Sequence, residues 1–579
     1  MRDRTYEADF CVVGGGLAGL SAAIAAARHG AKTILVNDRP VLGGNASSEI
    51  RMWICGAHGE NNHETGIIEE LLLENAWRNT CPNYSIWDSI LYGIAVAQKN
   101  LTLLQNCFVN EADTEQNRIT RVHGWQMTTE TKVTIEARLF ADCSGDGILG
   151  ALAGAEWRMG REARSEFGES IAPVAADKRT MGLSCLIQVR ETGRPQPFIP
   201  PSFAYTYPDD GSLPTRDHLL GGDQNFWWLE VGGMGDTIHD KEELRDELLK
   251  IAFGVWDHIK NRGDHGADTW VLDWVGFLPG KRESRRFVGD HILSQGDIEK
   301  SGAHFEDVVA FGGWTMDDHF PEGFYKKEAG TIWHPAPSPY AIPYRSLYSR
   351  NIDNLFFAGR NISASHTALS STRVMATCST LGQAVGTAAS IAVRDALQPR
   401  GVYESRLREL QETLMEDDCF LPGLKRSVNE LTAKGNWTAT RGDPEALRNG
   451  WDRQVGEALN SWDAEPGDCL DIEFDRVERL DSIRLVFDSN LSRTTHNMTP
   501  YYTLAPQDFV VPPELIRSFR IEADPGDGKF RTVIGMDENH QRLLRIPLAL
   551  SAKRLRFIPL RTWGAEQTRV FALDLYPGA

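Results

Sequence analysis

The chain has 579 residues, of which 41% are hydrophobic and 24% charged, a composition typical of a globular protein with several domains. Its formal net charge of −19 leaves no basic excess for neutralising phosphates, which argues against nucleic acid and anionic membrane surfaces as partners. No apolar run approaches membrane-spanning length and no leader precedes the first predicted strand, so we expect a cytoplasmic protein. The nine scattered cysteines show no C-x-x-C spacing, and we therefore predict neither a disulfide framework nor a metal site.

A glycine-rich turn follows the first predicted strand at residues 10–13. The spacing of its glycines is G-x-G-x-x-G, and an alanine-rich helical pattern comes next. A strand, turn and helix in this order hold a dinucleotide pyrophosphate, because the glycines let backbone amides approach the phosphates and the helix N-terminus attracts negative charge. The predicted contacts in this turn are Gly14, Gly16, Leu17, Ala18 and Gly19. By itself the motif also leaves open a glycine-rich turn without a ligand.

The second predicted strand, residues 32–36, ends where such a unit usually carries an acid for the ribose hydroxyls. Here Asn37 occupies the strand end and Asp38 comes one position later, so either residue can accept the ribose hydrogen bond. The next loop is expected to wrap a second phosphate and one edge of the cofactor. Its candidate residues are Arg39, Gly43, Gly44, Asn45, Ala46, Ser47 and Ser48. A polar surface loop is the alternative.

Four separated motifs resemble, in order, the FAD-dependent oxidoreductases of the glutathione-reductase and succinate-dehydrogenase flavoprotein superfamily. They lie at residues 38–49, 139–147, 279–287 and 354–386, and the resemblance spans residues 9–422. It implies FAD, for which a covalent link to a histidine stays open, and noncovalent binding is expected because no family-like histidine lies in the turn at 45–48. The contacts that it adds are Asp142, Gly145, Asp146, Gly359, Arg360, Leu381, Gly382 and Gln383. The last three belong to a closing helix whose N-terminus is expected at the flavin. Arg360 stands where the family often carries an acid, so a phosphate contact and a structural role are both open.

The order of these motifs predicts an α/β fold with a Rossmann-type FAD-binding domain, an inserted α+β substrate domain and a C-terminal all-β sandwich. The FAD-binding domain is expected at residues 1–160 and 346–425, and the substrate domain at residues 161–345. From residue 426 to 579, short alternating segments separated by turns predict a jelly roll. This part resembles discoidin or galactose-binding-like domains, for which sugar binding and a packing or oligomer-contact role are equally open.

Candidate catalytic groups come from segments that the resemblance brings to the flavin face. The five predicted are Arg51, His58, Arg285, His366 and Arg373, and further candidates are Cys55, His63, Arg161, Arg164, Arg282 and Arg286. A histidine that titrates near neutral pH can take a proton from a substrate alcohol or amine while hydride leaves for flavin N5. Arginines can clamp a carboxylate or stabilise an oxyanion. For each histidine the alternative is a hydrogen-bonded structural residue.

The predicted function is FAD-dependent hydride transfer to or from a small polar metabolite. A sugar or sugar acid is suggested by the jelly-roll resemblance alone. A reductase or isomerase of an unsaturated substrate, and a carbohydrate-binding or assembly protein with a structural flavin, are the alternatives. Because only one glycine fingerprint is visible, the electron partner is expected to be the substrate itself, a quinone, a carrier protein or oxygen. The acceptor stays unassigned, and a homo-oligomer is left open.

Overall fold

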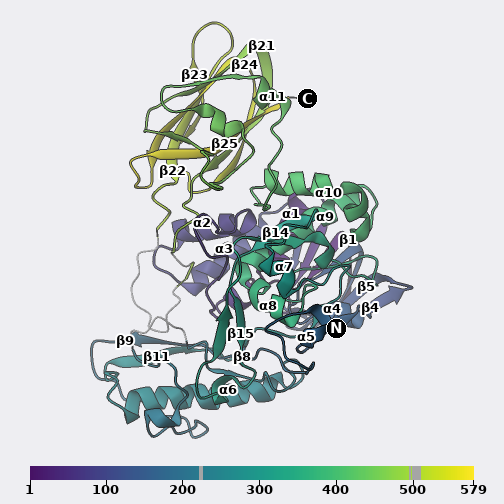
Figure 1. Ribbon diagram of the computed structural model, residues 1–579, viewed down its shortest axis with the longest axis vertical. Coiled ribbons are helices and arrows are strands. Elements are labelled where there is room, and N and C mark those ends of the chain that lie inside the picture. Colours follow the sequence, from purple (N-terminus) through teal and green to yellow (C-terminus); the bar gives the residue numbers. More distant parts are fainter. Residues whose placement is uncertain (221–225, 495–496, 499–509, 579) are drawn as a thin grey trace. The chain divides into compact units, whose positions relative to one another are not determined.

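The N-terminal strand, turn and helix begin a parallel βαβ arrangement in the computed structural model, which describes residues 1–220, 226–494, 497–498 and 510–578 (Figure 1). The central strand β1 pairs in parallel with β2 on one side and β6 on the other, and β18 extends the parallel sheet from the end of β6. The strands of this sheet are β1 (Arg2–Val13), β2 (Thr33–Val36), β3 (Leu101–Leu104), β4 (Cys107–Glu115), β5 (Arg118–Gln126), β6 (Thr131–Asp142) and β18 (Leu355–Phe357). The parallel strands therefore bring their carboxyl ends to one edge, where ligands of such sheets bind.

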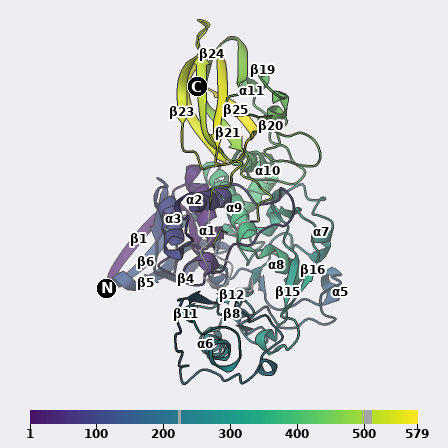
Figure 2. The ribbon, with the colours of Figure 1, turned by 90° about the vertical axis from the view of Figure 1, so that its left-hand side faces the viewer.

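Two long helices, α1 (Leu17–Arg28) and α9 (Met375–Arg394), pack against each other beside this sheet (Figure 2). Alanines and glycines let the helix backbones approach closely. A Cβ atom on Gly382 would lie 1.9 Å from the Ala18 carbonyl oxygen, and one on Gly386 would lie 2.1 Å from that of Ala22. Glycine is therefore required at both positions for helix packing.

The segment between β6 and β18 builds several small sheets. Its strands are β7 (Trp157–Arg158), β8 (Leu183–Ser184), β9 (Ile187–Glu191), β10 (Glu230–Val231), β11 (Trp270–Val275), β12 (Gly280–Lys281), β13 (Arg286–Phe287), β14 (Val308–Gly312), β15 (Met316–His319), β16 (Thr331–His334) and β17 (Tyr340–Pro343). Its longest helix, α6 (Lys241–Asp257), packs Leu248, Ile251 and Trp256 into a separate hydrophobic core.

The described residues divide into two compact units. Unit 1 comprises Met1–His58, Cys81–Leu410 and the described part of His496–Gln507, and unit 2 comprises Gly59–Thr80 and the described parts of Gln411–Thr495 and Asp508–Ala579. The remaining helices of unit 1 are α3 (Tyr84–Val96), α4 (Ile148–Leu152), α5 (Arg164–Phe167), α7 (Gln295–Glu299), α8 (His366–Thr372) and the start of α10 (Pro399–Glu416), with short turns η1 (Gly44–Ala46), η2 (Met127–Thr129), η3 (Asp210–Ser212), η4 (His258–Arg262), η5 (Gly323–Tyr325) and η6 (Tyr344–Ser346).

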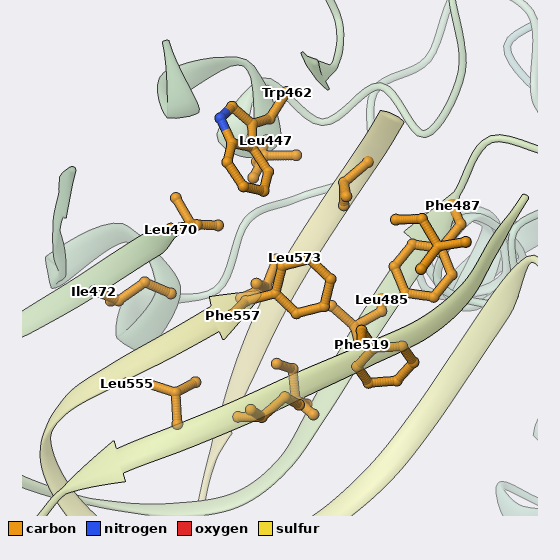
Figure 3. Close-up of a cluster of buried hydrophobic side chains, with 14 of the residues drawn as sticks. Leu447, Trp462, Leu470, Ile472, Leu485, Phe487, Phe519, Leu555, Phe557 and Leu573 are labelled. Carbon is orange, nitrogen blue, oxygen red and sulfur yellow. The ribbon is translucent and has the colours of Figure 1, made fainter. Parts of the chain in front are cut away.

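Unit 2 is built on an antiparallel sheet with the strand order β20-β25-β21-β24-β22-β23, and β19 also pairs with β21. Its elements are α11 (Glu430–Lys434), β19 (Asn436–Ala439), η7 (Pro444–Arg448), β20 (Trp462–Ala464), β21 (Leu470–Phe487), β22 (Ile516–Asp524), β23 (Arg531–Met536), β24 (Leu543–Thr562) and β25 (Thr568–Pro577). Strand β21 runs over 18 residues, and its pairing with β24 shifts register between Glu473 and Glu478. Figure 3 shows Trp462, Phe487 and Phe519 in the buried core.

Helix α2 (Ile67–Arg78) belongs to unit 2, although its sequence lies within the first 160 residues. Leu73 and Ala76 enter the hydrophobic core of the antiparallel sheet. The ring of Trp77 stacks on His540 with centroids 4.0 Å apart. Unit 2 thus draws on residues 59–80 and on residues before 426, because the apolar face of α2 is buried against that core. No helix in the described ranges is long and apolar enough to cross a membrane.

Candidate functional site

A cleft in unit 1 opens where β1 and β2 end, at the carboxyl edge of the parallel sheet. Its lining comes from segments that are far apart in the sequence: the glycine turn, the loop after β2, the turn after β6, β12, and the chain on both sides of α8. The predicted residues among them are Gly14, Gly16, Leu17, Ala18, Asn37, Asp38, Arg39, Gly43, Gly44, Asn45, Cys55, Gly145, Arg282, Gly359, Arg360 and Arg373. Tertiary folding thus assembles most of the predicted cofactor contacts in one place.

The three glycines of the turn have different surroundings. A Cβ on Gly14, whose φ is +108°, would lie 2.4 Å from the Cys143 carbonyl oxygen, and one on Gly19 would lie 1.8 Å from that of Gly14. Gly16 has open space instead, with its nearest neighbour, the Gly44 Cα, at 4.0 Å. Helix α1 begins at Leu17 without a side-chain cap, so its first amides are available to an anion beside Gly16. Gly14 and Gly19 are needed for packing, whereas Gly16 leaves room for a ligand.

Asn37 and Asp38 take different roles at the end of β2. The Asn37 Oδ1 accepts a hydrogen bond from the Gly15 amide at 3.1 Å, and its Nδ2 donates to the Val41 carbonyl at 2.8 Å. These bonds hold the glycine turn against the loop that follows β2. Asp38 is exposed at the cleft, so the displaced acid is the acceptor available to a ribose hydroxyl.

The loop after β2 meets the glycine turn through a second pair of glycines. Gly43 and Gly44 have φ values of +101° and +60°, and the Gly43 amide donates to the Gly15 carbonyl at 2.8 Å. Asn45 also lines the cleft and donates to the Lys281 carbonyl at 3.1 Å.

Ala46, Ser47 and Ser48 lie outside the cleft lining, contrary to the expectation for this loop. Ala46 and Ser47 are buried, and the Ser47 hydroxyl closes the short turn by donating to the Gly44 carbonyl at 2.7 Å. The Ser48 amide donates to Asp88 at 3.1 Å. These three residues therefore stabilise the conformation of the loop and do not contact the cleft.

Two arginines of the cleft keep buried donors without hydrogen-bond partners among the described residues. These donors are Nη1 of Arg39 and Nε of Arg373. The nearest acid to Arg39, the Glu49 Oε2, is 3.8 Å away. A buried unpaired donor is costly unless a ligand satisfies it, so the Arg39 atom, the open side of Gly16 and the α1 N-terminus together fit an anionic dinucleotide such as FAD, and the Arg373 atom is left for a second anionic group.

Arg360 reaches the cleft as part of a buried charge cluster. Asp146 accepts from Arg360 Nη2 at 2.7 Å and from Lys281 Nζ at 2.6 Å. Burial lowers the pKa of Lys281 to about 8; Asp146 opposes this effect, and the nearby Arg360 adds to it. Both cations line the cleft, while Asp146 lies behind them and holds them in place. Arg360 thus places a cation where the family often has an acid, and this cation pairs with Asp146 of the motif at residues 139–147.

Asp142 faces away from the cleft at the end of β6. Its Oδ1 accepts from the Ser144 hydroxyl at 2.7 Å and its Oδ2 from the Gly150 amide at 3.0 Å. Burial raises the pKa of this carboxyl. Asp142 therefore fixes the turn that presents Gly145, instead of contacting a cofactor.

The closing helix meets the cleft with its first turn only. Val374, Met375 and Cys378 line the cleft, and α9 begins at Met375. Leu381, Gly382 and Gln383 are buried one turn further on and do not line it. The absence of a side chain at Gly382 is explained by its packing on Ala18, so the expected approach to the flavin does not account for this glycine.

His366 is enclosed by two carboxylates. Its Nδ1 lies 2.9 Å from Glu283 Oε2, and its Nε2 lies 3.1 Å from Asp318 Oδ1. Burial disfavours the charged imidazolium, but the Glu283 and Asp318 carboxylates outweigh it and raise the pKa of His366 to about 10. At neutral pH both nitrogens donate, so His366 has no lone pair with which to take a proton from a substrate.

Like His366, the catalytic candidates Arg51, His58 and Arg285 lie outside the cleft lining. His58 stacks on Trp314 with centroids 4.2 Å apart, and burial lowers its pKa. Arg51 donates to Gln188 at 2.7 Å beneath the ring of Trp274. Arg285 donates to the Asp146 carbonyl at 3.1 Å. His63 belongs to unit 2.

Arg373 and Arg282 form the polar wall of the cleft. Arg373 Nη2 donates to Asp317 Oδ2 at 2.9 Å, and Arg282 pairs with Glu230 at 3.4 Å. His319 links the two acids, with Nδ1 2.7 Å from Glu230 and Nε2 3.2 Å from Asp317. This buried chain of alternating basic and acidic groups fixes the orientation of both guanidinium groups.

Several lining residues carried no individual prediction, among them Met52, Trp53, Phe108, Ser184 and Lys281. Lys281 lies within the third motif at residues 279–287, so this motif could have indicated it as a cation at the site. Phe108 and Ser184 belong to strands with no motif of their own, so no local pattern distinguished them.

A family model described as FAD dependent oxidoreductase matches residues 9–414. A search of the curated proteins finds no match. Among solved structures, the family 32 carbohydrate-binding module of Streptococcus pneumoniae EndoD is 13% identical over 25% of this chain and 98% of the module, with a TM-score of 0.20. The family 32 module of Clostridium perfringens NanJ, in complex with galactose, is 11% identical over 25% of this chain and 94% of the module, with a TM-score of 0.18. At these values the two likenesses support no inference about ligands.

Proposed function

Since the chain belongs to the FAD dependent oxidoreductase family, we propose that it catalyses hydride transfer to or from a small polar metabolite that carries a carboxylate, such as a sugar acid. The observation that carries this proposal is the unpartnered Nε of Arg373, which is buried in the wall of the cleft beside Arg282. A guanidinium with a free donor in a fixed orientation is suited to planar recognition of a carboxylate.

The residues that would hold FAD are those of the glycine turn and its surroundings. The open side of Gly16 and the first amides of α1 receive the pyrophosphate, Arg39 adds a cation, and Asp38 accepts from the ribose. The first turn of α9 contributes a further positive dipole end to the cleft. When bound, FAD supplies the hydride chemistry.

The buried acids and histidine behind the arginines hold the substrate-facing groups still. Arg282 donates to the Ser184 hydroxyl at 2.7 Å and to the Trp227 carbonyl at 3.1 Å, so its planar group is fixed from two sides. Burial lowers the pKa of Arg282, Glu230 opposes this effect, and the proximity of Arg373 lowers the pKa further. An anion placed between two neighbouring guanidinium groups relieves their mutual repulsion, which favours a carboxylate over a neutral polar group.

The test is anaerobic bleaching of the flavin absorbance by a panel that pairs each sugar acid with its neutral sugar. We expect bleaching by acids and not by their neutral partners. In Arg373→Lys, which keeps the charge but loses the Nε donor, the half-saturating acid concentration should rise about tenfold or more while FAD stays bound. The matched control is Arg190→Lys, an exposed arginine paired with Asp273, which should behave as the unaltered chain.

Two results would reject the proposal. Bleaching by neutral sugars as readily as by acids would remove the carboxylate specificity, and an unchanged half-saturating concentration in Arg373→Lys would remove the role of this arginine. If an unsaturated acid instead reoxidises the reduced enzyme and no saturated acid bleaches it, the physiological direction is reduction.

A further inference from the structure

Three histidines and one aspartate converge in the substrate-domain segment, away from the cleft. Asp210 begins η3, His218 lies in the loop after it, His258 is the first residue of η4, and His265 follows that turn. One side-chain donor atom from each of the four residues lies within 4.8 Å of all the others. None of the four lines the cleft.

The spacing of these donor atoms matches a tetrahedral metal site. Zinc–nitrogen and zinc–oxygen bonds of about 2.0–2.2 Å place the four ligands of a tetrahedron roughly 3.3–3.5 Å apart. The His258 Nε2 lies 2.9 Å from Asp210 Oδ1 and 3.1 Å from His265 Nε2. Asp210 Oδ1 is 3.6 Å from His218 Nε2 and 3.8 Å from His265 Nε2. These four distances fall on both sides of the ideal edge, and the two remaining pairs of donor atoms lie within 4.8 Å.

The backbone orients the imidazole nitrogens toward this common point. The Nδ1 atoms of His258 and His218 lie 2.9 and 3.0 Å from the carbonyl oxygens of Tyr207 and Arg216. A carbonyl can only accept, so both Nδ1 atoms carry a proton, and in the neutral ring the Nε2 atom then has the lone pair that a metal ion would bind. Hydrogen bonds from the outer nitrogen to a carbonyl are the usual support of metal-binding histidines.

Two of the histidines are deeply buried, and the inner nitrogen of the third has no hydrogen-bond partner in the described part of the chain. The side chains of His258 and His265 are 0% and 6% exposed, and the buried Nε2 of His218 makes no hydrogen bond to any described residue. Asp210 is exposed and supplies the one negative charge and a route of entry for an ion.

The backbone at His258 is itself unusual. Helix α6 ends at Asp257, and His258–Arg262 forms a π-helical turn. Such turns are rare and occur frequently at functional sites. Here the turn directs His258 toward Asp210, 48 residues earlier in the chain.

We propose that Asp210, His218, His258 and His265 bind one divalent metal ion, with zinc as the best match to three imidazoles and one carboxylate in a tetrahedral arrangement. Calcium and magnesium are disfavoured because they require mainly oxygen ligands. With all four positions taken by protein, the ion is structural. It ties the loop at 210–218 to the end of α6 and so secures the core around Trp256.

The experiment measures metal in the purified, FAD-loaded full-length chain by mass spectrometry, before and after chelator dialysis and reloading with zinc. We expect about one zinc per chain, and after loading with cobalt(II) the intense visible absorption of a tetrahedral site. His218→Ala and His265→Ala should each weaken zinc binding at least tenfold to a hundredfold. The control is His239→Ala, an exposed histidine that pairs with Asp236 outside the cluster.

FAD content and circular dichroism report whether each variant folds, and the cobalt spectrum of the unaltered chain decides the matter if both cluster variants fail to fold. Less than stoichiometric zinc after reloading, or an octahedral cobalt spectrum, would overturn the proposal. Zinc binding by His218→Ala and His265→Ala that equals that of His239→Ala would also overturn it.

Discussion

Replacing His366 by glutamine tests whether this residue stabilises the fold as an imidazolium. Its ring lies between Glu283 and Asp318, and the side chain is 5% exposed. Glutamine keeps a hydrogen-bond donor but removes the charge, which leaves Arg286, with Nε 3.5 Å from Glu283 Oε1, as the remaining buried cation beside Glu283. Breaking a buried pair of this kind costs about 3–5 kcal/mol, and the rise of the His366 pKa from 6.5 to about 10 corresponds to a similar free energy.

The sign of the pH dependence follows from the raised pKa. The folded chain holds the His366 proton more tightly than the unfolded chain, so this stabilisation is complete below about pH 6.5 and is lost as the pH rises through about 10. Urea unfolding followed by flavin fluorescence and circular dichroism at several pH values between 6 and 10.5 measures it. The unaltered chain should lose stability across this range, and His366→Gln should start lower and show a flatter profile.

His304→Gln is the control, since His304 is an exposed histidine that pairs with Asp297 at 3.2 Å. It should keep the slope of the unaltered chain. If His366→Gln unfolds with that same slope and midpoint but its flavin is reduced by substrate much more slowly, the structural account is refuted and His366 acts in the reaction.

Three further predictions concern the cleft and the helices behind it. Gly382→Ala should destabilise the chain by about 2 kcal/mol or more because its Cβ meets the Ala18 carbonyl, whereas Gly93→Ala in α3, with open space around it, should be neutral or stabilising in thermal unfolding. Gly16→Ala should keep the thermal stability of the FAD-free chain yet weaken FAD binding roughly tenfold or more, measured by fluorescence titration, because its Cβ enters open space at the cleft; equal FAD affinity would show that the pyrophosphate lies elsewhere. Raising the pH from 7 to 9 should weaken FAD binding about fivefold, because Lys281 in the cleft lining loses its positive charge near pH 8. The Lys281→Arg variant should bind FAD with the same affinity at both pH values. If its FAD affinity still falls between pH 7 and 9, another group causes the pH dependence.

The glycine turn was predictable because its information is local. Strand, turn and helix follow each other within residues 10–28, and the positive φ at Gly14 is a property of that position. The alternating pattern after residue 430 likewise predicted antiparallel strands, since the two faces of a strand are set by its own sequence. The family resemblance and the FAD expectation rest on such local motifs, and the family model confirms both.

Side-chain roles were less predictable, because they depend on partners far along the chain. The sequence left the ribose contact open between Asn37 and Asp38, and only the partners Gly15 and Val41 give Asn37 a structural role. His366 looked like a base until Glu283, 83 residues away, was found beside it.

The histidine cluster is the clearest example of a feature that depends on residues far apart in the sequence. His258 and His265 lie on a helix end and a loop, and neither the cysteine spacing nor any short motif indicated a metal site. Only the folding of α6 against the loop at 210–218 brings Asp210 within 2.9 Å of His258.

The sequence alone thus determined the backbone of the cofactor turn and the class of the protein, because propensities and turn geometry act between near neighbours. The tertiary structure decided which side chains face the cleft, which only support it, and where four distant ligands meet, because burial and long-range packing set those contacts.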